Sequence, residues 1–305
     1  MIHFIINPLS STGKGAEKWK IIEEILKKNG TEYSAHLTTG YLDARNHAAG
    51  LVKSGEHVTI IAVGGDGTVN EVLSGIDDFS KVTFGYIPSG SSNDLARDIG
   101  LSKDPEEALS SILHPKEYRE IDVGRLESGN EVRNFSVSMG MGFDAAICHE
   151  ALHSKLKYSL NRIGLGKLTY GIIALKQLYG MKPCDCTLLL DGTKKVELKE
   201  LIFVTVMNHR YEGGGFMFCP DAKDNDGYLD ICVASSIKKL KVLFILPFAF
   251  SGKHVRFKGV DVYRAKKVEI LAKRPCAVHS DGESAGVEAK VKVYLNNSKL
   301  KMIVR

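Results

Sequence analysis

Hydrophobic and polar positions along the first third of the chain follow two periods in turn, one typical of strands and one typical of helices. Short runs rich in β-branched residues predict strands at residues 2–7, 33–38, 58–63 and 82–87. Between them, apolar residues three and four positions apart predict helices at residues 14–29, 42–53 and 68–73. Trp19 falls on the apolar stripe of the first helix, so we expect it in the core. This alternation indicates a parallel sheet with helices on both faces, a three-layer α/β domain.

Beyond residue 122 the pattern changes to longer strands separated by turns, with two helical stretches among them. The predicted strands lie at residues 133–139, 186–190, 201–207, 229–234, 267–271, 277–280 and 291–295. Consecutive strands indicate an antiparallel β-sandwich, and Asp191-Gly192 is a turn signal typical of a hairpin. With 305 residues, 44% of them hydrophobic, the chain exceeds the usual size of one domain. We expect an α/β domain over residues 1–122 and an all-β sandwich domain over residues 123–296.

Three glycines surround one carboxylate where the predicted strand 58–63 ends. Gly64, Gly65 and Gly67 allow the backbone to approach a ligand closely, and the helix that follows presents free N–H groups to the turn. Phosphate is the expected ligand. Asp66 would repel phosphate unless a divalent cation lay between them, so the turn predicts a site for a nucleotide with Mg²⁺. The alternative is an ordinary strand-to-helix turn, for which one glycine would suffice.

A second polar turn follows the predicted strand 82–87 and leads into another helix. Ser91 and Asp94 have the spacing of a capping box, as do Thr68 and Glu71 after the first turn. Turns at the carboxyl ends of neighbouring parallel strands should face one another, so the Ser91 hydroxyl is expected to contact phosphate. Asp94 either shares the metal with Asp66 or is an acidic residue that favours the start of its helix.

Charge and cysteine content narrow the classes of protein. The net charge of +5 gives no argument for nucleic-acid binding, so we expect no nucleic-acid partner. The six cysteines are scattered and lack zinc spacing, which favours reduced structural thiols. The first residues lack the pattern of a signal peptide, and no run of about 18 apolar residues is present. These features predict a soluble cytoplasmic protein.

The motifs at the two turns are similar to those of a known enzyme family. Gly64-Gly65-Asp66-Gly67-Thr68, followed by Asn70-Glu71 and later by Asn93-Asp94-Leu95-Ala96-Arg97, resembles the catalytic domain of diacylglycerol and sphingosine kinases. The soluble bacterial lipid kinases of that family are the most similar. Further matching segments are Asn134-Phe135, Gly140-x-Gly142-Phe143-Asp144-Ala145, Gly213-Gly214-Gly215, Pro220-Asp221-Ala222, Asp226-Gly227-Tyr228-Leu229-Asp230 and Asp281-Gly282-Glu283.

This resemblance implies a fold and a reaction. It implies a nucleotide domain similar to NAD kinases and diacylglycerol kinases, to which a last strand in residues 297–305 returns, and a lipid-binding sandwich with the active site between the two. It also implies transfer of the γ-phosphoryl group of ATP, with Mg²⁺, to a lipid hydroxyl, with diacylglycerol as the expected acceptor. The residues assigned to the nucleotide and its metal are Asn7, Thr38, Gly64, Gly65, Asp66, Gly67, Thr68, Asn70, Glu71, Ser91 and Asp94.

The resemblance also assigns the general base to the turn at residues 281–283. We expect Glu283 to accept the proton of the lipid hydroxyl, because phosphoryl transfer needs positioning, charge neutralisation and a proton acceptor. Asp281 is then expected in the metal and water network. Asp281 as the base, or a simple Asp-Gly hairpin turn, are the alternatives.

An acidic loop at residues 220–228 is the second candidate metal site. Hard cations bind carboxylates and carbonyls in such turns, although the pattern of an EF-hand is not met. The resemblance implies a structural Mg²⁺ held by Asp226 and the carbonyls of Lys223 and Tyr228. An acidic turn before a strand, without a metal, is the alternative.

Residues 238–258 contain six Lys or Arg and no acidic residue around an apolar run at residues 242–250. This segment is either a core helix with solvated ends or a site that docks on an anionic membrane surface. We favour the core helix, because nine apolar residues are too few to span a membrane and Pro247 interrupts them. Met139, Met141 and a predicted helix at residues 163–179 are candidates for an apolar lipid pocket, although such residues are more often core.

Two other functions are compatible with the sequence. An NAD kinase shares the Gly-Gly-Asp-Gly element, but the spacing of Asn70-Glu71 and Asn93-Asp94 favours a lipid kinase. A nucleotide- or lipid-binding regulator without activity is disfavoured by the intact set of carboxylates. Whether the chain forms a homodimer stays open.

Overall fold

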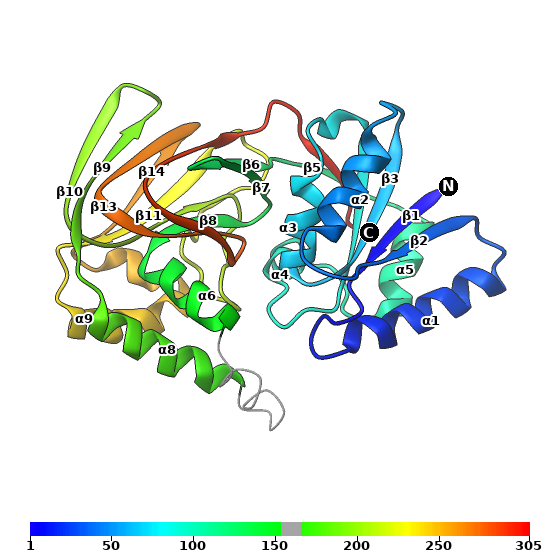
Figure 1. Cartoon of the computed structure of the whole chain (residues 1–305), viewed down its shortest axis with the longest axis horizontal. Helices are drawn as coiled ribbons and strands as arrows, with labels where there is room; N and C mark the ends of the chain where they lie inside the picture. The colour runs from blue at the N-terminus through cyan, green and yellow to red at the C-terminus, as the bar shows by residue number, and fades with distance from the viewer. Residues whose placement is uncertain (154–165) are drawn as a thin grey trace.

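A six-stranded, mainly parallel sheet forms the centre of the N-terminal domain in the computed structural model, which describes residues 1–153 and 166–305 (Figure 1). The strands lie in the order β2-β1-β3-β4-β15-β5, and only the β15–β5 pair is antiparallel. Their bounds are Tyr33–Leu37, Ile2–Ile6, Val58–Gly64, Val82–Pro88, Leu300–Ile303 and Tyr118–Ile121. The carboxyl ends of β1, β3 and β4 therefore meet at one edge of the sheet.

Helices cover both faces of this sheet. Helices α2 and α3 pack together on one face and α1 and α5 on the other, each pair over its own buried apolar cluster. Trp19 belongs to the second cluster, is 6% exposed and packs on Phe4, which confirms its prediction as a core residue. The helical bounds are α1 Lys14–Lys28, α2 Asp43–Val52, α3 Asp66–Ser74, η1 Phe79–Lys81, α4 Asp94–Ile99 and α5 Pro105–Leu113.

A nine-stranded antiparallel sheet forms the C-terminal domain. Its order is β12-β11-β10-β8-β13-β14-β6-β7, and β9 pairs with both β10 and β13. One apolar cluster fills the sheet's interior, and Asp191 and Gly192 take positive φ at the β9–β10 hairpin, as predicted. The strand bounds are β6 Gly124–Ser128, β7 Glu131–Phe135, β8 Ser138–Gly142, β9 Cys184–Leu190, β10 Lys194–Met207, β11 Leu229–Ser235, β12 Val260–Ala265, β13 Lys267–Ser280 and β14 Glu283–Leu295.

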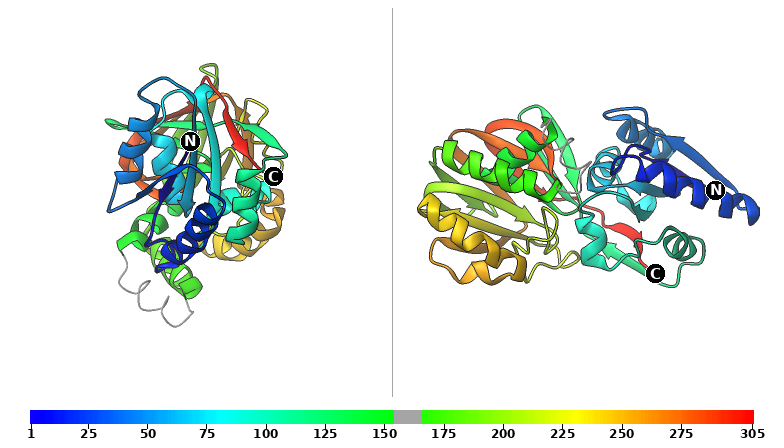
Figure 2. Two further views of the ribbon diagram at one scale, coloured as in Figure 1. Left: turned by 90° about the vertical axis from the view of Figure 1, so that its right-hand side faces the viewer. Right: turned by 90° about the horizontal axis from the view of Figure 1, so that it is seen from below.

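Helices pack against one face of this second sheet, opposite the face whose side chains form the first apolar cluster (Figure 2). They are α6 Phe143–His153, α8 Gly166–Gly180, α9 Lys239–Ile245, η2 Leu246–Ser251 and η3 Lys253–Arg256. A separate apolar cluster joins them to the strands. Residues 163–165, the start of the predicted helix 163–179, lie outside the described residues. None of the described helices is long and apolar enough to span a bilayer.

Two predicted strand patterns in this domain were wrong. The predicted strand 133–139 is two strands, because the backbone N–H groups of residues 136–138 donate to the Asp281 carboxylate instead of a neighbouring strand. The predicted strands 267–271 and 277–280 are one strand, β13, whose register with β14 shifts between Leu271 and Cys276. This irregularity accommodates Pro275, which has no N–H to donate to a ladder.

Both predicted capping boxes were also wrong. Helix α3 begins at Asp66 and α4 at Asp94, and neither has a side chain that caps its first turn. The Thr68 hydroxyl instead accepts a hydrogen bond from Asn7 Nδ2, at 3.2 Å. Glu71 accepts backbone hydrogen bonds from Leu42 and Ala44 at the start of α2. Thr68 and Glu71, which the local pattern assigned to a helix cap, therefore form tertiary contacts instead.

Buried amide side chains join the two domains. Asn70 Nδ2 on α3 lies within 3.1 Å of Asn134 O, Ser280 Oγ and Asp281 Oδ2 in the second domain. Asn134 in turn donates to the carbonyls of Leu73 and Ile76 at the end of α3. Because buried amides must be hydrogen-bonded, these contacts fix how the second domain lies against α3.

Candidate active site

The two predicted turns lie against each other at the carboxyl edge of the parallel sheet. Gly64 at the end of β3 pairs with Pro88 at the end of β4, and the backbone N–H groups of Ser89 and Gly90 donate to Gly64 O. A Cβ atom on Gly90 would lie 2.5 Å from Gly65 Cα, so a side chain cannot fit between the turns. The facing arrangement expected from the sequence is confirmed, and it depends on glycine at both positions.

Asp66 opens α3 directly beneath these turns. Its Oδ2 accepts a hydrogen bond from the Asp94 N–H at 3.2 Å, whereas its Oδ1 is buried and has no hydrogen-bond partner among the residues that the structure describes. Burial, together with the charge of Asp94 and more weakly that of Asp281, raises the pKa of Asp66 to about 7. A buried carboxylate oxygen without a donor beside another carboxylate is the environment that a divalent cation would stabilise. The residues therefore fit the predicted Mg²⁺.

Asp94 lies between the two domains. Arg97 Nη1 donates to its Oδ1 at 2.8 Å, and the backbone N–H of Gly214 in the second domain donates to its Oδ2 at 2.8 Å. Burial raises the pKa of Asp94 despite these two donors. Asp94 is thus near Asp66, as predicted, but its side chain also holds the glycine run 213–215 against the nucleotide domain.

The other residues assigned to the nucleotide divide into two groups. Asn7, Thr38 and Ser91 lie on the loops at the carboxyl edge, and Thr68 lies in the first turn of α3. Asn7 contacts Thr68, and Ser91 Oγ lies 3.1 Å from Ser11 Oγ. Asn70 and Glu71 contact the second domain and the start of α2, respectively. A role for any of them in binding the nucleotide stays a prediction.

Sequence patterns gave no indication of one contact at this edge. Ser10 Oγ and Ser89 Oγ are buried 2.6 Å apart and join the loop after β1 to the turn after β4. Lys18 also reaches this region, where its Nζ donates to Pro88 O at 2.8 Å. None of Ser10, Ser89 and Lys18 belongs to a motif with a recognisable spacing, so only the folded chain brings these contacts about.

The turn between β13 and β14 carries the two predicted catalytic carboxylates. The Asp281 carboxylate accepts hydrogen bonds from the N–H groups of Ser136, Val137 and Ser138 at 2.8–3.0 Å. Asn70 donates to the same carboxylate. Both oxygens of Asp281 are therefore occupied, and the turn is fixed to β8. Its place in a metal network stays a prediction.

Glu283 faces the glycine turn of the other domain. A Cβ atom on Gly67 would overlap Glu283 Oε1, so glycine at this position leaves room for the Glu283 side chain. Glu283 pairs with Ser280 across the hairpin, and Asp281 and Gly282 between them take positive φ. The candidate base thus lies against the loop expected to hold the phosphates.

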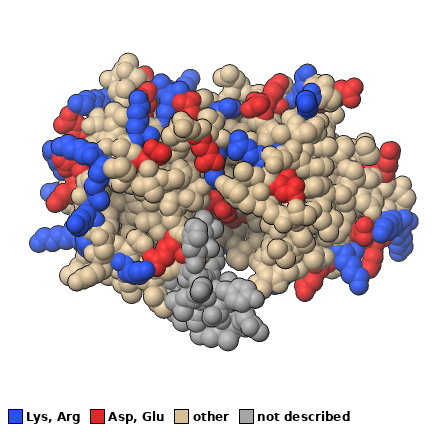
Figure 3. Space-filling view, viewed as in Figure 1, with Lys and Arg blue, Asp and Glu red and all other residues tan. Residues whose placement is uncertain are grey.

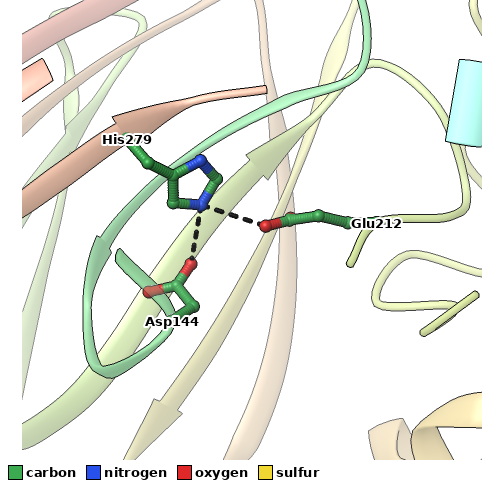
Figure 4. A group of neighbouring side chains, drawn as sticks. All are labelled: Asp144, Glu212 and His279. Carbon is green, nitrogen blue, oxygen red and sulfur yellow. Dashed lines mark hydrogen bonds and ion pairs between the residues drawn. The ribbon is translucent and has the colours of Figure 1, made fainter. Parts of the chain in front are cut away.

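A cluster of three side chains lies beside the β13–β14 turn (Figure 4). His279 Nε2 lies 3.2 Å from Asp144 Oδ2 and 3.0 Å from Glu212 Oε1. The Gly282 N–H points to His279 Nδ1, at 3.2 Å. Burial lowers the pKa of His279, but the Glu212 and Asp144 carboxylates outweigh this effect and raise the pKa well above its ordinary value. Burial raises the pKa of Asp144 above its ordinary value, and the hydrogen bond with His279 lowers it by less.

The cluster joins three segments around the site. Asp144 is at the start of α6, Glu212 precedes the glycine run 213–215, and His279 is two residues before Asp281. The three ligand atoms lie within 4.8 Å of one another, as in a metal site. A metal-bound histidine, however, donates through its other ring nitrogen, whereas His279 Nδ1 faces the Gly282 N–H, which is itself a donor. The cluster therefore positions the loops. No sequence pattern predicts this cluster, because its three members come from separate segments of the chain.

Removing the histidine should destabilise the protein strongly. We expect His279→Gln to lower the free energy of unfolding by about 3–5 kcal/mol, because two buried carboxylates would lose their shared donor. In urea unfolding, the double variant His279→Gln/Glu212→Gln should lose less than the sum of the two single variants. The exposed His114→Gln serves as control. Strictly additive losses would mean that the three side chains do not act together.

The acidic loop is held by contacts within the protein. Asp226 pairs with Arg264, and its Oδ1 accepts from the Tyr228 N–H at 3.1 Å. The Arg264 guanidinium lies 4.5 Å from the centre of the Tyr228 ring, and Asp122 accepts from the Gly227 N–H. These contacts describe a compact turn, so a structural Mg²⁺ bound by Asp226 and the carbonyls of Lys223 and Tyr228 stays a prediction.

A melting experiment tests this second metal site separately from the first. In an Asp66→Asn background, Mg²⁺ should still raise the melting temperature, and adding Asp226→Asn should abolish that increase, because binding to the folded state alone stabilises it. Asp221→Asn, in the same loop but exposed, should retain the increase. An Mg²⁺ response that Asp226→Asn leaves intact would exclude Asp226 as a ligand.

Two family models match consecutive parts of the chain. The diacylglycerol kinase catalytic domain matches residues 1–126, and the YegS C-terminal NAD kinase beta sandwich-like domain matches residues 137–303. The chain belongs to the diacylglycerol kinase family. As a member it is a phosphotransferase with an alcohol group as acceptor, and its N-terminal α/β and C-terminal antiparallel domains are those of the family. The fold class predicted from the sequence is confirmed.

Individual relatives agree with this assignment. A diacylglycerol kinase of Mycobacterium tuberculosis is 31% identical over 92% of this chain and 88% of its own length, and one of Bacillus subtilis is 28% identical over 93% and 89%. A diacylglycerol kinase structure from Bacillus anthracis str. Sterne matches the fold with a TM-score of 0.71 at 21% identity, over all of this chain and 96% of its own. An NAD kinase from Archaeoglobus fulgidus shares the fold more distantly, with a TM-score of 0.54 at 13% identity over 99% and 93% of the two chains.

Proposed function

We propose that the chain phosphorylates diacylglycerol to phosphatidic acid, with ATP as donor and Mg²⁺ as the metal. The observation that carries this proposal is the contact of Glu283 with Gly67, because it brings a candidate base from one domain against the candidate phosphate loop of the other. The homologous diacylglycerol kinases support the choice of acceptor. Because ATP is supplied inside cells, we also propose a cytoplasmic location.

The glycine turn and the start of α3 would bind the phosphates. The N-cap of α3 is Gly65, which has no side chain to occupy the first N–H groups of the helix. Those groups and the positive end of the helix dipole favour an anion. The Archaeoglobus NAD kinase of similar fold was solved in complex with ATP. This arrangement would orient the terminal phosphate towards the second domain.

Asp66 and Asp94 would hold the metal. The buried, unpartnered Oδ1 of Asp66 supports its role as a ligand, and the raised pKa of both carboxylates reflects a charge that a cation would offset. When bound, Mg²⁺ neutralises charge on the phosphates.

Glu283 would act as general base. The lipid hydroxyl oxygen forms a bond to the γ-phosphorus, the bond from that phosphorus to the bridging oxygen breaks, ADP leaves, and the hydroxyl proton passes to the Glu283 carboxylate. Asp281 is the weaker candidate because three backbone N–H groups already occupy its oxygens, although burial raises the pKa of its carboxyl group above the ordinary value. Asp281 and His279 would instead hold Glu283 in place, through contacts to residues 136–138 and to Gly282.

An assay with radiolabelled ATP tests the proposal. The purified protein is incubated with Mg²⁺ and, separately, with diacylglycerol, ceramide, sphingosine or NAD, the lipids being dispersed in detergent micelles. We expect label in diacylglycerol alone, and none when EDTA replaces Mg²⁺. Labelled ceramide or sphingosine would correct the acceptor, and labelled NAD would replace the proposed function with that of an NAD kinase. Label in none of them would favour a nucleotide-binding regulator.

A further inference from the structure

Helix α9 has apolar side chains on both of its faces. Val242 and Ile245 are 5% exposed and belong to the core cluster of the C-terminal helices. On the opposite side, Leu240 is 82% exposed and Phe244 is 62% exposed. A surface helix usually carries polar residues there. Our preference for a plain core helix was therefore only half correct, because the outer face of α9 is apolar and uncovered.

Further exposed apolar side chains lie beside this helix. Phe250 in η2 is 55% exposed, and Leu175 and Tyr179 on α8 are 54% and 89% exposed. Lys239 Nζ donates to Tyr179 O and Met181 O, which fixes the start of α9 to the end of α8. Figure 2, seen from below, shows both helices on the same end of the domain. We call this surface the helical face, defined by Leu175, Tyr179, Leu240, Phe244 and Phe250.

Basic residues flank the helical face. Residues 238–258 contain five exposed Lys or Arg residues and no acidic residue. None of these five forms an ion pair with a described residue. They are Lys238, Lys241, Lys253, Arg256 and Lys258. In the space-filling view, Lys and Arg side chains lie along the outer margin of the C-terminal domain, with Asp and Glu side chains among them (Figure 3). Unpaired positive charge around exposed apolar side chains complements an anionic lipid surface.

We propose that the helical face docks on an anionic phospholipid bilayer. The exposed Leu, Phe and Tyr side chains enter the boundary between headgroups and acyl chains, and the flanking Lys and Arg side chains contact the anionic headgroups. Attachment is peripheral, because no described helix can span a bilayer. The inference rests on the proposed function, since diacylglycerol resides in the membrane and the enzyme must reach it there.

An aromatic contact connects this face with the active site. The Phe250 ring stacks on the Phe216 ring at a centroid distance of 4.1 Å. Phe216 follows the glycine run 213–215, whose Gly214 N–H donates to Asp94. Only the Phe216 side chain would therefore separate a bilayer that contacts Phe250 from the glycine run 213–215, which borders the candidate metal site. This continuity favours a lipid surface over a partner protein as the occupant.

Vesicle sedimentation tests the proposal. The full chain should sediment with vesicles of phosphatidylcholine and phosphatidylglycerol but not with vesicles of phosphatidylcholine alone. We expect Lys238→Gln/Lys241→Gln to weaken binding by about 30-fold, at about 1 kcal/mol per basic residue. Leu240→Ser/Phe244→Ser should weaken it by about 100-fold, because two large apolar side chains no longer enter the interface. Val287→Ser, at a 58% exposed position on β14, is the matched control and should bind as the wild type does.

Kinase assays separate this inference from the proposed function. The same variants should lose activity towards diacylglycerol in anionic vesicles and keep it towards a short-chain, dispersed diacylglycerol. Wild-type sedimentation without any kinase activity would contradict the function and not the docking. Kinase activity on vesicles with unchanged sedimentation of both double variants would overturn the docking. A wild-type dimer that Leu240→Ser/Phe244→Ser dissociates, without vesicle binding, would assign the face to a second copy of the chain.

Discussion

Glu283→Gln is expected to lower the rate of lipid phosphorylation by about 10²–10⁴-fold, the usual contribution of a general base. Glutamine has nearly the same shape, so the side chain still fits against Gly67, but its amide cannot accept the hydroxyl proton. ATP affinity should remain within about twofold of the wild type, because the phosphates are bound by the other domain. Turnover with radiolabelled ATP and equilibrium binding of a fluorescent ATP analogue measure the two quantities.

A matched substitution on the same strand controls for general effects on β14. Glu288→Gln has the same chemistry, and Glu288 lies farther along β14, opposite Cys276. It should leave both turnover and ATP binding unchanged. If Glu283→Gln were as active as the wild type while Asp281→Asn was inactive and still folded, the base would be Asp281.

Asp66→Asn should abolish most activity and yet stabilise the metal-free protein. In the unfolded chain an aspartate loses its proton near its ordinary pKa of 3.8, whereas burial and the charge of Asp94 hold the pKa of folded Asp66 at about 7. Between these values the folded state binds more protons, so the free energy of unfolding falls as the pH rises. The loss is about 4 kcal/mol in total and is complete above pH 7. Asparagine carries no charge, so it removes this dependence.

The amide should also fit the site. The side-chain oxygen of asparagine can accept a hydrogen bond from the Asp94 N–H in place of Asp66 Oδ2. The asparagine NH₂ group then takes the place of Oδ1, which has no partner among the described residues. At pH 8 in EDTA we therefore expect a higher melting temperature for the variant than for the wild type. Mg²⁺ should stabilise the wild type more than the variant, because the carboxylate ligand is missing.

Thermal unfolding from pH 4 to pH 8, with EDTA and with Mg²⁺, measures these differences. Asp77→Asn is the control, because the Asp77 side chain is 95% exposed and distant from the turns. It should follow the wild type at every pH. A variant at Asp66 that is less stable than the wild type in EDTA at pH 8, and still active, would make Asp66 a structural residue and not a metal ligand.

Much of the fold could be predicted from local patterns. The strand predicted at residues 58–63 is β3, Val58–Gly64, which is one residue longer. The prediction succeeds because a continuous β-branched run that is buried on both faces is typical of a strand in a parallel sheet. The break between β7 and β8 could not be predicted. It exists because Asp281, far away in the sequence, accepts the N–H groups that would otherwise extend the strand.

The candidate site divides in the same way. The glycine turn is one short segment, so its chemistry could be predicted from the sequence alone. It comprises Gly64, Gly65, Asp66 and Gly67. The cluster of Asp144, Glu212 and His279 could not, because its members come from three separate segments and only the folded chain brings their side chains together. The contact of Glu283 with Gly67 likewise depends on how the domains pack.

Helix α9 shows which properties follow from the sequence and which depend on the tertiary structure. Composition determined that residues 238–258 are basic and apolar, because residue types do not depend on conformation. Which apolar residues face the core was decided by packing: the cluster that contains Val242 and Ile245 leaves Leu240 and Phe244 uncovered. Helical geometry places side chains on all sides of the axis, and only neighbouring elements determine which side is buried.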